Sequence, residues 1–264
     1  METILQGEGW DKGWTQLLEM MGNAAAVTDR SFAVPDGVNN GQYGVGIVID
    51  FFGLAGKYSG FPVDFVYPSM TSVVPANIAL IAGGKNPDEA KKFMAFSMST
   101  EGQQLLFDPK ISRLPILPYS QLKAPAGYPD PQEVAKRAKV QFDANLSEAR
   151  YQVVTSLFDQ MVTFRLKELQ GATKAIQDAE KALKAKPNAR GSDLVKQARA
   201  LAYTPLVGAE NVKNEQFLEL FRKSRRDVEV SKQLSGQEQL WANKARENYA
   251  RAQQLATEAR GLAK

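Results

Sequence analysis

The sequence contains no cysteine and no histidine among its 264 residues. Thiol nucleophiles, Ser–His triads, zinc fingers and imidazole bases are therefore all excluded. No apolar run approaches the ~20 residues that a membrane-spanning helix needs, so the sequence predicts no transmembrane segment. The opening stretch METILQGEGWDKGW carries neither a basic start nor an apolar run, and we expect no signal peptide in it.

Signatures of nucleotide and acid–base chemistry are also missing. No phosphate-binding loop ending in Gly-Lys-Ser/Thr is present. Gly41, Gly44 and Gly46 lie before and inside an apolar run, whereas a dinucleotide fingerprint places its glycines after the strand. No two carboxylates stand out by their spacing as a general acid and base. The sequence therefore predicts a protein that is not an enzyme and has no cofactor and no metal site.

The charged residues are distributed unevenly along the chain. Residues 1–130 hold 9 basic and 13 acidic residues, a net −4, which leaves 24 basic and 16 acidic residues, a net +8, for residues 131–264. Such a step predicts two parts with different roles. The basic stretch FRKSRR at residues 221–226 has no interleaved aromatic residues, so we interpret it as a solvated helix face and expect no nucleic-acid partner.

The first part of the chain alternates strand-like apolar runs with helical periodicity. Four runs are typical of strands, and the last of them contains Pro75, which favours an edge or a bend. These expected strands are residues 23–29, 43–50, 62–68 and 72–84. Alternation of strands with helices predicts an α/β fold with a mainly parallel sheet.

A proline-rich connector at residues 111–132 separates this part from a helical one. Beyond it, apolar residues recur at helical spacing over residues 146–186 and again over residues 215–264. Arg113 lies among apolar residues in the connector, where a structural ion pair is a more common role for arginine than a ligand clamp.

Three short stretches contain candidate ligand-binding residues. Thr28, Arg30 and Ser31 lie between an expected strand end and a helix start, where hydroxyls, a guanidinium and free N–H groups suit an anion. The alternative is that Ser31 is an N-cap and Arg30 a solvated charge. Thr71 lies in a second polar loop, which follows the expected strand at residues 62–68. The run GVGIVIDFFG (residues 44–53) ends in Asp50 and two phenylalanines, which are either a buried strand end or the floor of a ligand site.

The order of several segments resembles a known family. Residues 22–53 (GNAAAVTDRSFAVPDGVNNGQYGVGIVIDFFG), 73–106 (VVPANIALIAGGKNPDEAKKFMAFSMSTEGQQLL) and 108–118 (DPKISRLPILP) look like the second half of a type II periplasmic solute-binding protein. The resemblance is to the branch of ferric-ion, aminoethylphosphonate and phosphoglycerate binding proteins. The stretch FDANLSEARYQVVTSLFDQMVTFRLKEL is similar to the helical C-terminus of phosphoglycerate transport regulatory proteins.

This resemblance implies an organisation and a role. Residues 1–66 would end the second solute-binding lobe, residues 67–130 would form the crossover and the returning part of the first lobe, and residues 131–264 would be a helical region. The N-terminal lobe would be missing. The implied protein is periplasmic, binds a small anionic phosphate or phosphonate such as phosphoglycerate, and presents it to an ABC permease or a membrane sensor kinase.

The resemblance also implies roles for individual residues. Iron-binding members carry two tyrosines where this chain has Phe51 and Phe52, which argues against iron because a phenyl ring cannot coordinate Fe(III). The implied anion site is Thr28, Arg30, Ser31 and Thr71, with Asp50 receiving an amine or hydroxyl and the two phenyl rings walling the cleft. The rival interpretation is an interaction protein that acts on a membrane transporter or sensor kinase through its basic helical tail.

Overall fold

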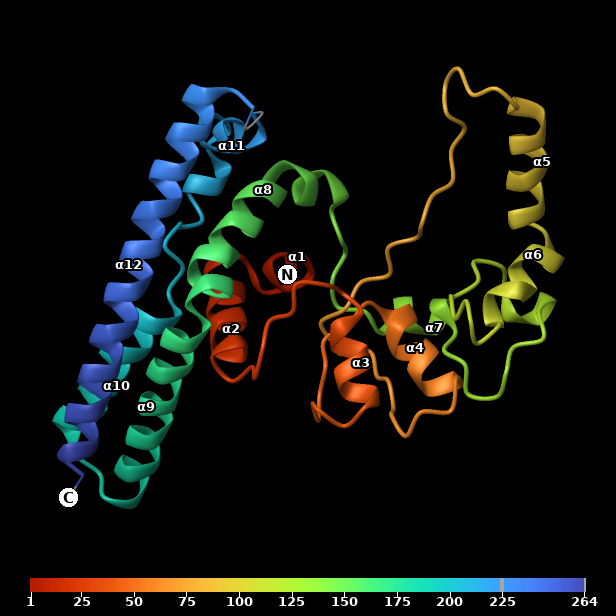
Figure 1. Ribbon diagram of the computed structural model, residues 1–264. Helices are drawn as coiled ribbons and strands as arrows, with labels where there is room; N and C mark the ends of the chain where they lie inside the picture. Colours follow the sequence, from red (N-terminus) through yellow and green to blue (C-terminus); the bar gives the residue numbers. More distant parts are fainter. Residues whose placement is uncertain (224–225, 264) are drawn as a thin grey trace. The chain divides into compact units, whose positions relative to one another are not determined.

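The computed structural model describes residues 1–223 and 226–263 (Figure 1). The chain forms two units, each compact in itself. The first, which we call the helical unit, comprises Met1–Val27 and Asp143–Lys264, and the second, the inserted unit, comprises Thr28–Phe142. These boundaries follow contacts within the chain; the three-part division implied by the family resemblance stays a prediction. No helix in the described ranges is long and apolar enough to cross a membrane.

The helical unit is built from helices on both sides of the insertion. In it α12 lies alongside α9 and α10, and α2 packs on α9 (Figure 1). Its helices are α1 (Glu2–Glu8), α2 (Trp10–Gly22), α8 (Ala144–Met161), α9 (Leu166–Ala185), α10 (Ala189–Tyr203), α11 (Glu215–Arg222) and α12 (Val228–Gly261), with 3-10 turns η3 (Thr163–Arg165) and η4 (Asn211–Lys213).

Helix α2 enters the core through one apolar face. Trp10, Trp14, Leu17 and Leu18 recur at helical spacing and are all buried. The Trp10 Nε1–H donates a hydrogen bond to the Val207 carbonyl oxygen at 2.7 Å, so the polar atom of this buried ring is satisfied. The helical spacing of these apolar residues in the sequence therefore corresponds to the buried face of α2.

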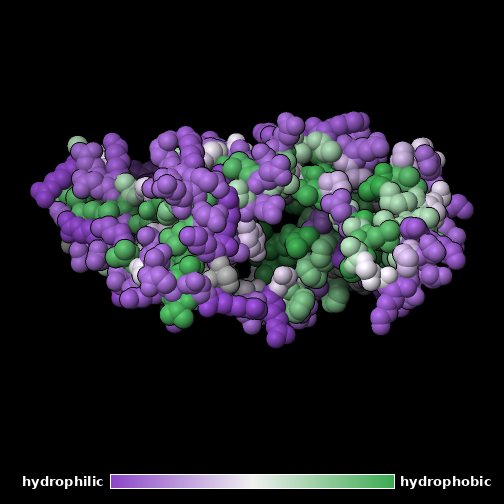
Figure 2. Space-filling view, turned by 90° about the horizontal axis from the view of Figure 1, so that it is seen from above, coloured by the Kyte–Doolittle hydropathy of each residue, from purple (hydrophilic) through white to green (hydrophobic). Residues whose placement is uncertain are grey.

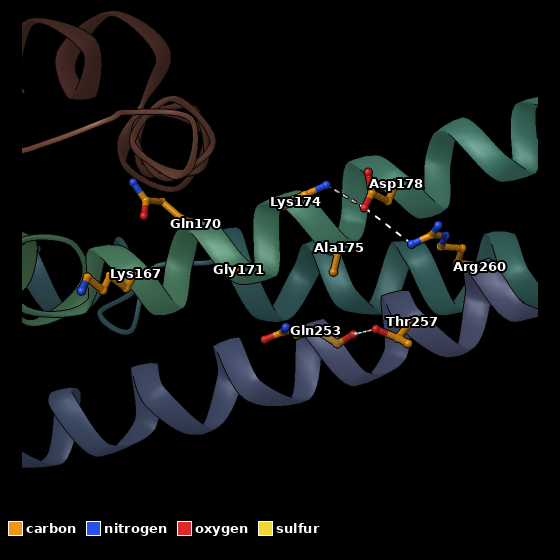
Figure 3. Close-up of a pocket in the computed structure, with 9 residues that line it drawn as sticks. All are labelled: Lys167, Gln170, Gly171, Lys174, Ala175, Asp178, Gln253, Thr257 and Arg260. Carbon is orange, nitrogen blue, oxygen red and sulfur yellow. Dashed lines mark hydrogen bonds and ion pairs between the residues drawn. The ribbon is translucent and has the colours of Figure 1, made fainter. Parts of the chain in front are cut away.

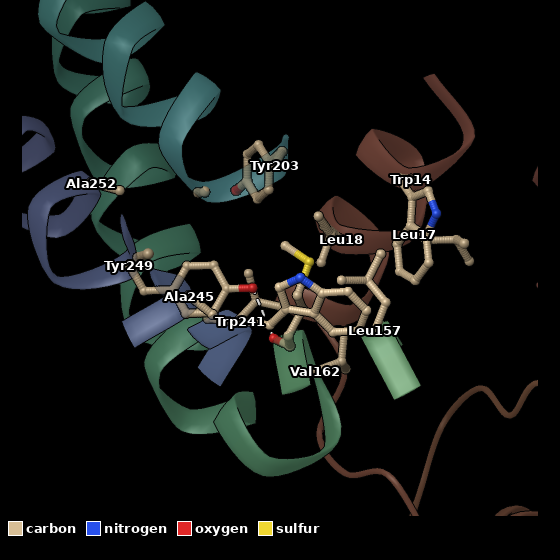
Figure 4. Close-up of a cluster of buried hydrophobic side chains, with 14 of the residues drawn as sticks. Trp14, Leu17, Leu18, Leu157, Val162, Tyr203, Trp241, Ala245, Tyr249 and Ala252 are labelled. Carbon is tan, nitrogen blue, oxygen red and sulfur yellow. Dashed lines mark hydrogen bonds between the residues drawn. The ribbon is translucent and has the colours of Figure 1, made fainter. Parts of the chain in front are cut away.

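Small residues allow α9 and α12 to approach each other closely. Both helices turn a row of alanines into the core, and Figure 4 shows Ala245 and Ala252 of α12 in the same buried cluster as the larger side chains of Tyr249 and Trp241. The buried alanines are Ala172 and Ala179 of α9 and Ala242, Ala245, Ala252, Ala256 and Ala259 of α12. The buried stripe of α9 continues almost to the end of the helix, since Ala179 and Leu183 are buried as well.

The helix expected over residues 146–186 is interrupted. Helix α8 ends at Met161, and α9 begins at Leu166 after the turn η3. The interruption leaves backbone carbonyls without helical partners, and the Tyr249 hydroxyl donates a hydrogen bond to one of them, the Met161 oxygen, at 2.8 Å. A contact made from 88 residues away, which helical periodicity does not reveal, therefore stabilises the end of α8.

The inserted unit has a much smaller core. Only Leu54, Phe107 and Tyr128 form its buried apolar cluster among the described residues, and α5 has no buried residue. Hydrophobic side chains accordingly lie at the molecular surface among hydrophilic ones (Figure 2). The helices of this unit are α3 (Ala33–Asn39), α4 (Asp50–Tyr58), α5 (Pro87–Ser97), α6 (Thr100–Gln104) and α7 (Pro131–Arg137), with 3-10 turns η1 (Leu105–Phe107) and η2 (Tyr119–Gln121).

The predicted α/β fold with a parallel sheet is wrong. Throughout residues 1–223 and 226–263 the structure contains helices and irregular segments but no strand. A strand requires backbone hydrogen bonds to a neighbouring strand, and the apolar runs have none. Residues 45–49 and 62–67 are non-helical and alternate between exposed and half-buried, so they keep the period of a strand without a partner.

Candidate functional site

The loop that precedes α3 carries three of the predicted ligand-binding residues. Arg30 and Ser31 are exposed, and Thr28 is half-buried. The Thr28 Oγ1 donates a hydrogen bond to the Arg30 carbonyl oxygen at 3.0 Å, which closes a local turn. Ser31 is not the N-cap of α3, since Phe32 occupies that position. The N-cap alternative is therefore incorrect for Ser31.

The structure gathers Asp50, Phe51, Phe52, Tyr67 and Arg113 into one group, which we call the Asp50 cluster. Asp50 is the first residue of α4 and does not end a strand as predicted. Its Oδ1 accepts a hydrogen bond from the Phe51 N–H at 2.8 Å, and its Oδ2 accepts one from the Tyr67 hydroxyl at 3.0 Å. A carboxylate at a helix start is also favoured by the helix dipole.

Aromatic rings surround this carboxylate. The Phe51 and Phe52 ring centroids lie 4.4 Å apart. Phe32 meets Phe52 edge-on at 6.4 Å, which places the loop containing Ser31 beside the cluster. The structure thus brings the two predicted phenylalanines together with Asp50, although their use as a cleft wall stays a prediction.

Arg113 supplies the positive charge of the cluster. Its guanidinium carbon lies 3.4 Å from the centroid of the Phe51 ring, a cation–π contact, and its Nη1 donates to the Ile111 carbonyl oxygen at 2.7 Å. In the described part of the chain it forms no ion pair, so the structural ion pair favoured from the sequence is not found. A guanidinium has five N–H donors, and the Ile111 contact uses one of them.

Close packing on α4 brings Tyr67 to Asp50. The Phe65 ring lies directly over Gly53, where any Cβ would collide with it, so residues 63–67 can run along the helix. Phe65 then meets Tyr67 edge-on at 4.8 Å. Burial, and then the neighbouring Asp50 carboxylate, raise the pKa of Tyr67 above its ordinary value, so its hydroxyl remains a hydrogen-bond donor at neutral pH.

Two residues show the limits of the sequence at this site. Thr71 is half-buried, and within the described residues no hydrogen bond joins it, Arg30 or Ser31 to the Asp50 cluster. Tyr67 was not predicted as a site residue. Its only signal in the sequence is its place at the end of an alternating apolar segment, which gives no reason to pair it with Asp50, 17 positions earlier.

A second site lies in the helical unit, in a groove between α9 and α12 with a volume of about 450 Å³ (Figure 3). Gly171 and Ala175 leave room between the helices, and longer polar side chains surround them. The residues that line the groove are Lys167, Gln170, Gly171, Lys174, Ala175, Asp178, Gln253, Thr257 and Arg260.

The lining of this groove has a net positive charge. The lining contains three cationic side chains, Lys167, Lys174 and Arg260, and one carboxylate, Asp178. The Asp178 Oδ2 lies 2.9 Å from the Lys174 Nζ and 3.7 Å from the Arg260 Nη1. The hydrogen bond from Lys174 lowers the pKa of Asp178, so this carboxylate stays ionised. The sequence showed an excess of basic residues in this part of the chain but did not locate the groove.

The basic stretch at residues 221–226 lies partly outside the described residues, which omit positions 224 and 225. Phe221, at its start, is buried and stacks on Trp241 with a centroid distance of 5.4 Å. Its neighbour Arg222 pairs with Glu215 on the surface of α11. In its described residues, this stretch therefore combines a core residue with a paired surface arginine.

Comparison with known proteins gives two findings. One family, described as bacterial extracellular solute-binding protein, matches residues 1–136. The phosphoglycerate transport regulatory protein PgtC of Salmonella typhimurium and that of Salmonella typhi are each 32% identical to the chain over 185 residues. The match covers 70% of this chain and 45% of each relative, so the chain spans about half the length of these curated relatives. No solved structure gives a significant match.

Proposed function

Because this chain belongs to the bacterial extracellular solute-binding proteins, we propose that it contributes the solute-binding function of a bacterial uptake or sensing system. The family and the relatives place it in a transport-related role. In our proposal the solute is a small anionic phosphate or phosphonate such as phosphoglycerate, and the chain binds it without catalysing a reaction. The periplasm is the proposed location.

The observation that carries this proposal is the 32% identity over 185 residues to proteins named for phosphoglycerate transport regulation. The Asp50 cluster supports it chemically. The free N–H donors of Arg113 suit a phosphate or carboxylate group of the solute. Asp50 suits a hydroxyl or amine of the same molecule, and the rings of Phe51 and Phe52 exclude water from one side.

The experiment is a thermal-shift screen of the purified chain with 3-phosphoglycerate, phosphoenolpyruvate, aminoethylphosphonate, inorganic phosphate and Fe(III). A solute at one hundred times its dissociation constant stabilises the native state by about 2.7 kcal/mol. We expect a shift with one organophosphate and none with Fe(III). If no anion in the panel shifts the transition, this chain does not bind the proposed class of solute.

The variant Arg113→Gln tests whether solute binding depends on the Asp50 cluster or only on the net charge of the chain. We expect this variant to lose the organophosphate shift. The matched control is Arg137→Gln, because Arg137 is also an exposed arginine of the inserted unit and donates its Nε–H to the Glu133 carbonyl oxygen in α7, away from the cluster. If both variants lose the shift equally, the effect comes from net charge and Arg113 has no special role.

A second candidate function is regulation of a membrane transporter or sensor kinase through the helical unit. The observation that favours it is the cationic lining of the groove between α9 and α12. Co-expression with the permease or sensor kinase of the same bacterium tests it, with Lys167→Glu at the groove and Lys232→Glu, an exposed lysine of α12 outside the groove lining, as the control. Co-purification that is weakened only by Lys167→Glu supports this function, and co-purification with neither protein contradicts it.

A further inference from the structure

Asp50 and Arg113 carry opposite charges in the same cluster, yet they do not pair with each other. Both contact Phe51, Asp50 through the backbone N–H and Arg113 over the ring. Among the residues that the structure describes, uncharged groups hold each of them instead. The Tyr67 hydroxyl donates to Asp50, and the Ile111 carbonyl oxygen accepts from Arg113. The cluster therefore presents a cation and an anion separately to a molecule that binds there.

Two hydrogen bonds fix the direction of the Asp50 carboxylate. Its Oδ1 accepts from the Phe51 N–H at 2.8 Å, and its Oδ2 accepts from the Tyr67 hydroxyl at 3.0 Å. A carboxylate has about four acceptor positions, so about two remain. Asp50 is half-buried, and water can occupy these positions. A bound molecule that covers them without donating a hydrogen bond leaves the carboxylate unpaired, which costs free energy.

Tyr67 orients this carboxylate before a solute binds. The Tyr67 ring meets Phe65 edge-on at 4.8 Å, and the Phe65 ring is itself packed against Gly53 of α4. Burial raises the pKa of Tyr67, so its hydroxyl stays protonated at neutral pH and donates to Asp50. A carboxylate that is already oriented loses less conformational entropy when a solute donates to it.

The two charges act on an anionic solute in opposite directions. Arg113 is exposed, and its free N–H donors attract a phosphate, phosphonate or carboxylate group. Asp50 repels the same group. A solute that also carries a hydroxyl or an ammonium group can donate to Asp50, and this hydrogen bond offsets the repulsion.

We infer that Asp50, held in place by Tyr67, selects solutes that carry a hydroxyl or ammonium group beside their anionic group and rejects similar anions that lack one. This inference rests on the proposed solute-binding function and narrows its class of solute. Asp50 is the specificity-determining residue, and Tyr67 is a positioning residue that acts through it. A site built to hydrogen-bond a hydroxyl or amine discriminates against the analogue without that group, because its polar atoms are then left unpaired.

Isothermal titration calorimetry of the full chain with two matched pairs of solutes tests this inference. One pair is 3-phosphoglycerate and 3-(phosphonooxy)propanoate, which lacks only the 2-hydroxyl. The other is 2-aminoethylphosphonate and propylphosphonate, in which a methyl group replaces the ammonium. In the pair that binds, we expect the Kd of the donor-bearing solute to be at least about tenfold lower than that of its analogue.

Three variants locate the source of this Kd ratio. Asp50→Asn keeps the side-chain volume but removes the charge, and Tyr67→Phe keeps the ring but no longer fixes the carboxylate. Each should lower the ratio by about fivefold or more. The matched control is Tyr58→Phe, which should leave the ratio unchanged. Tyr58 lies at the other end of α4 and donates its hydroxyl to the Gly127 carbonyl oxygen at 2.8 Å.

The ratio separates specificity from folding, because a variant that only folds less well weakens both members of a pair equally. Equal binding of the two members by the unmodified chain would overturn the inference but leave the proposed function intact. A ratio that survives Asp50→Asn and Tyr67→Phe, or that falls equally in Tyr58→Phe, would also overturn it. If no solute of either pair binds, the proposed function fails, and this inference fails with it.

Discussion

The ion pair between Glu2 and Arg150 offers the sharpest test of how the helical unit is held together. It joins α1 to α8 across 148 positions of sequence. The Arg150 Nε donates to both Glu2 carboxylate oxygens at 2.8 and 3.0 Å, and its Nη2 donates to Oε2 at 2.7 Å. The two side chains are only 8% and 11% exposed, so solvent screens the pair little.

Replacing Arg150 with methionine keeps most of the side-chain volume but leaves the Glu2 carboxylate without its cation. Removing one partner of a buried pair costs about 3 to 5 kcal/mol, because the remaining charge is uncompensated. We therefore expect Arg150→Met to lower the urea midpoint of the helical unit by about 1 to 2 M. Adding Glu2→Gln to the same chain should recover part of the loss, since the uncompensated charge is then gone.

Tryptophan fluorescence during urea unfolding measures this effect selectively. All three tryptophans, Trp10, Trp14 and Trp241, lie in the helical unit. The control is Lys196→Met, which removes an exposed pair with Asp193 and should leave the free energy of unfolding nearly unchanged. If Arg150→Met costs no more than Lys196→Met, the pair does not stabilise the docking of α1 on α8.

Two further predictions concern the same core. A Cβ at Gly22 would collide with the Thr173 hydroxyl, so Gly22→Ala should destabilise the helical unit by about 1 to 3 kcal/mol in urea unfolding. The control is Gly236→Ala, which should cause no such loss because a Cβ there meets no atom within 4 Å. Equal effects of the two substitutions would refute the close packing at Gly22. Burial raises the pKa of Tyr249 above its ordinary 10.0, so its contribution to stability is complete below that pH and is lost above it, because the unfolded chain ionises first. Tyr249→Phe should start about 1 to 3 kcal/mol less stable than the unmodified chain, because the Met161 carbonyl loses its hydrogen-bond donor. In urea unfolding measured below and above pH 10, its free energy of unfolding should then fall less steeply with rising pH. An unchanged slope of this free energy against pH would contradict the assignment.

The sequence determined the helical unit well because its signals are local. Trp10, Trp14 and Leu17 recur at helical spacing on the buried face of α2, and the two helical patterns beyond the proline-rich connector correspond to α8, α9, α11 and α12. The order of segments also identified the family. Neither result depends on knowing which elements touch, since periodicity and segment order are properties of the chain alone.

Only the tertiary structure decided the features that require contact between segments far apart in the sequence. An apolar run such as GVGIVI becomes a strand only when another backbone pairs with it, and in residues 1–223 and 226–263 none does, so the predicted sheet is absent. For the same reason the partners of site residues could not be predicted. Tyr67 reaches Asp50 because Gly53 admits the Phe65 ring, and Arg113 lies over Phe51 although 62 positions separate them in the sequence. Local patterns determine which conformation each segment favours, and only packing in space decides which segments meet.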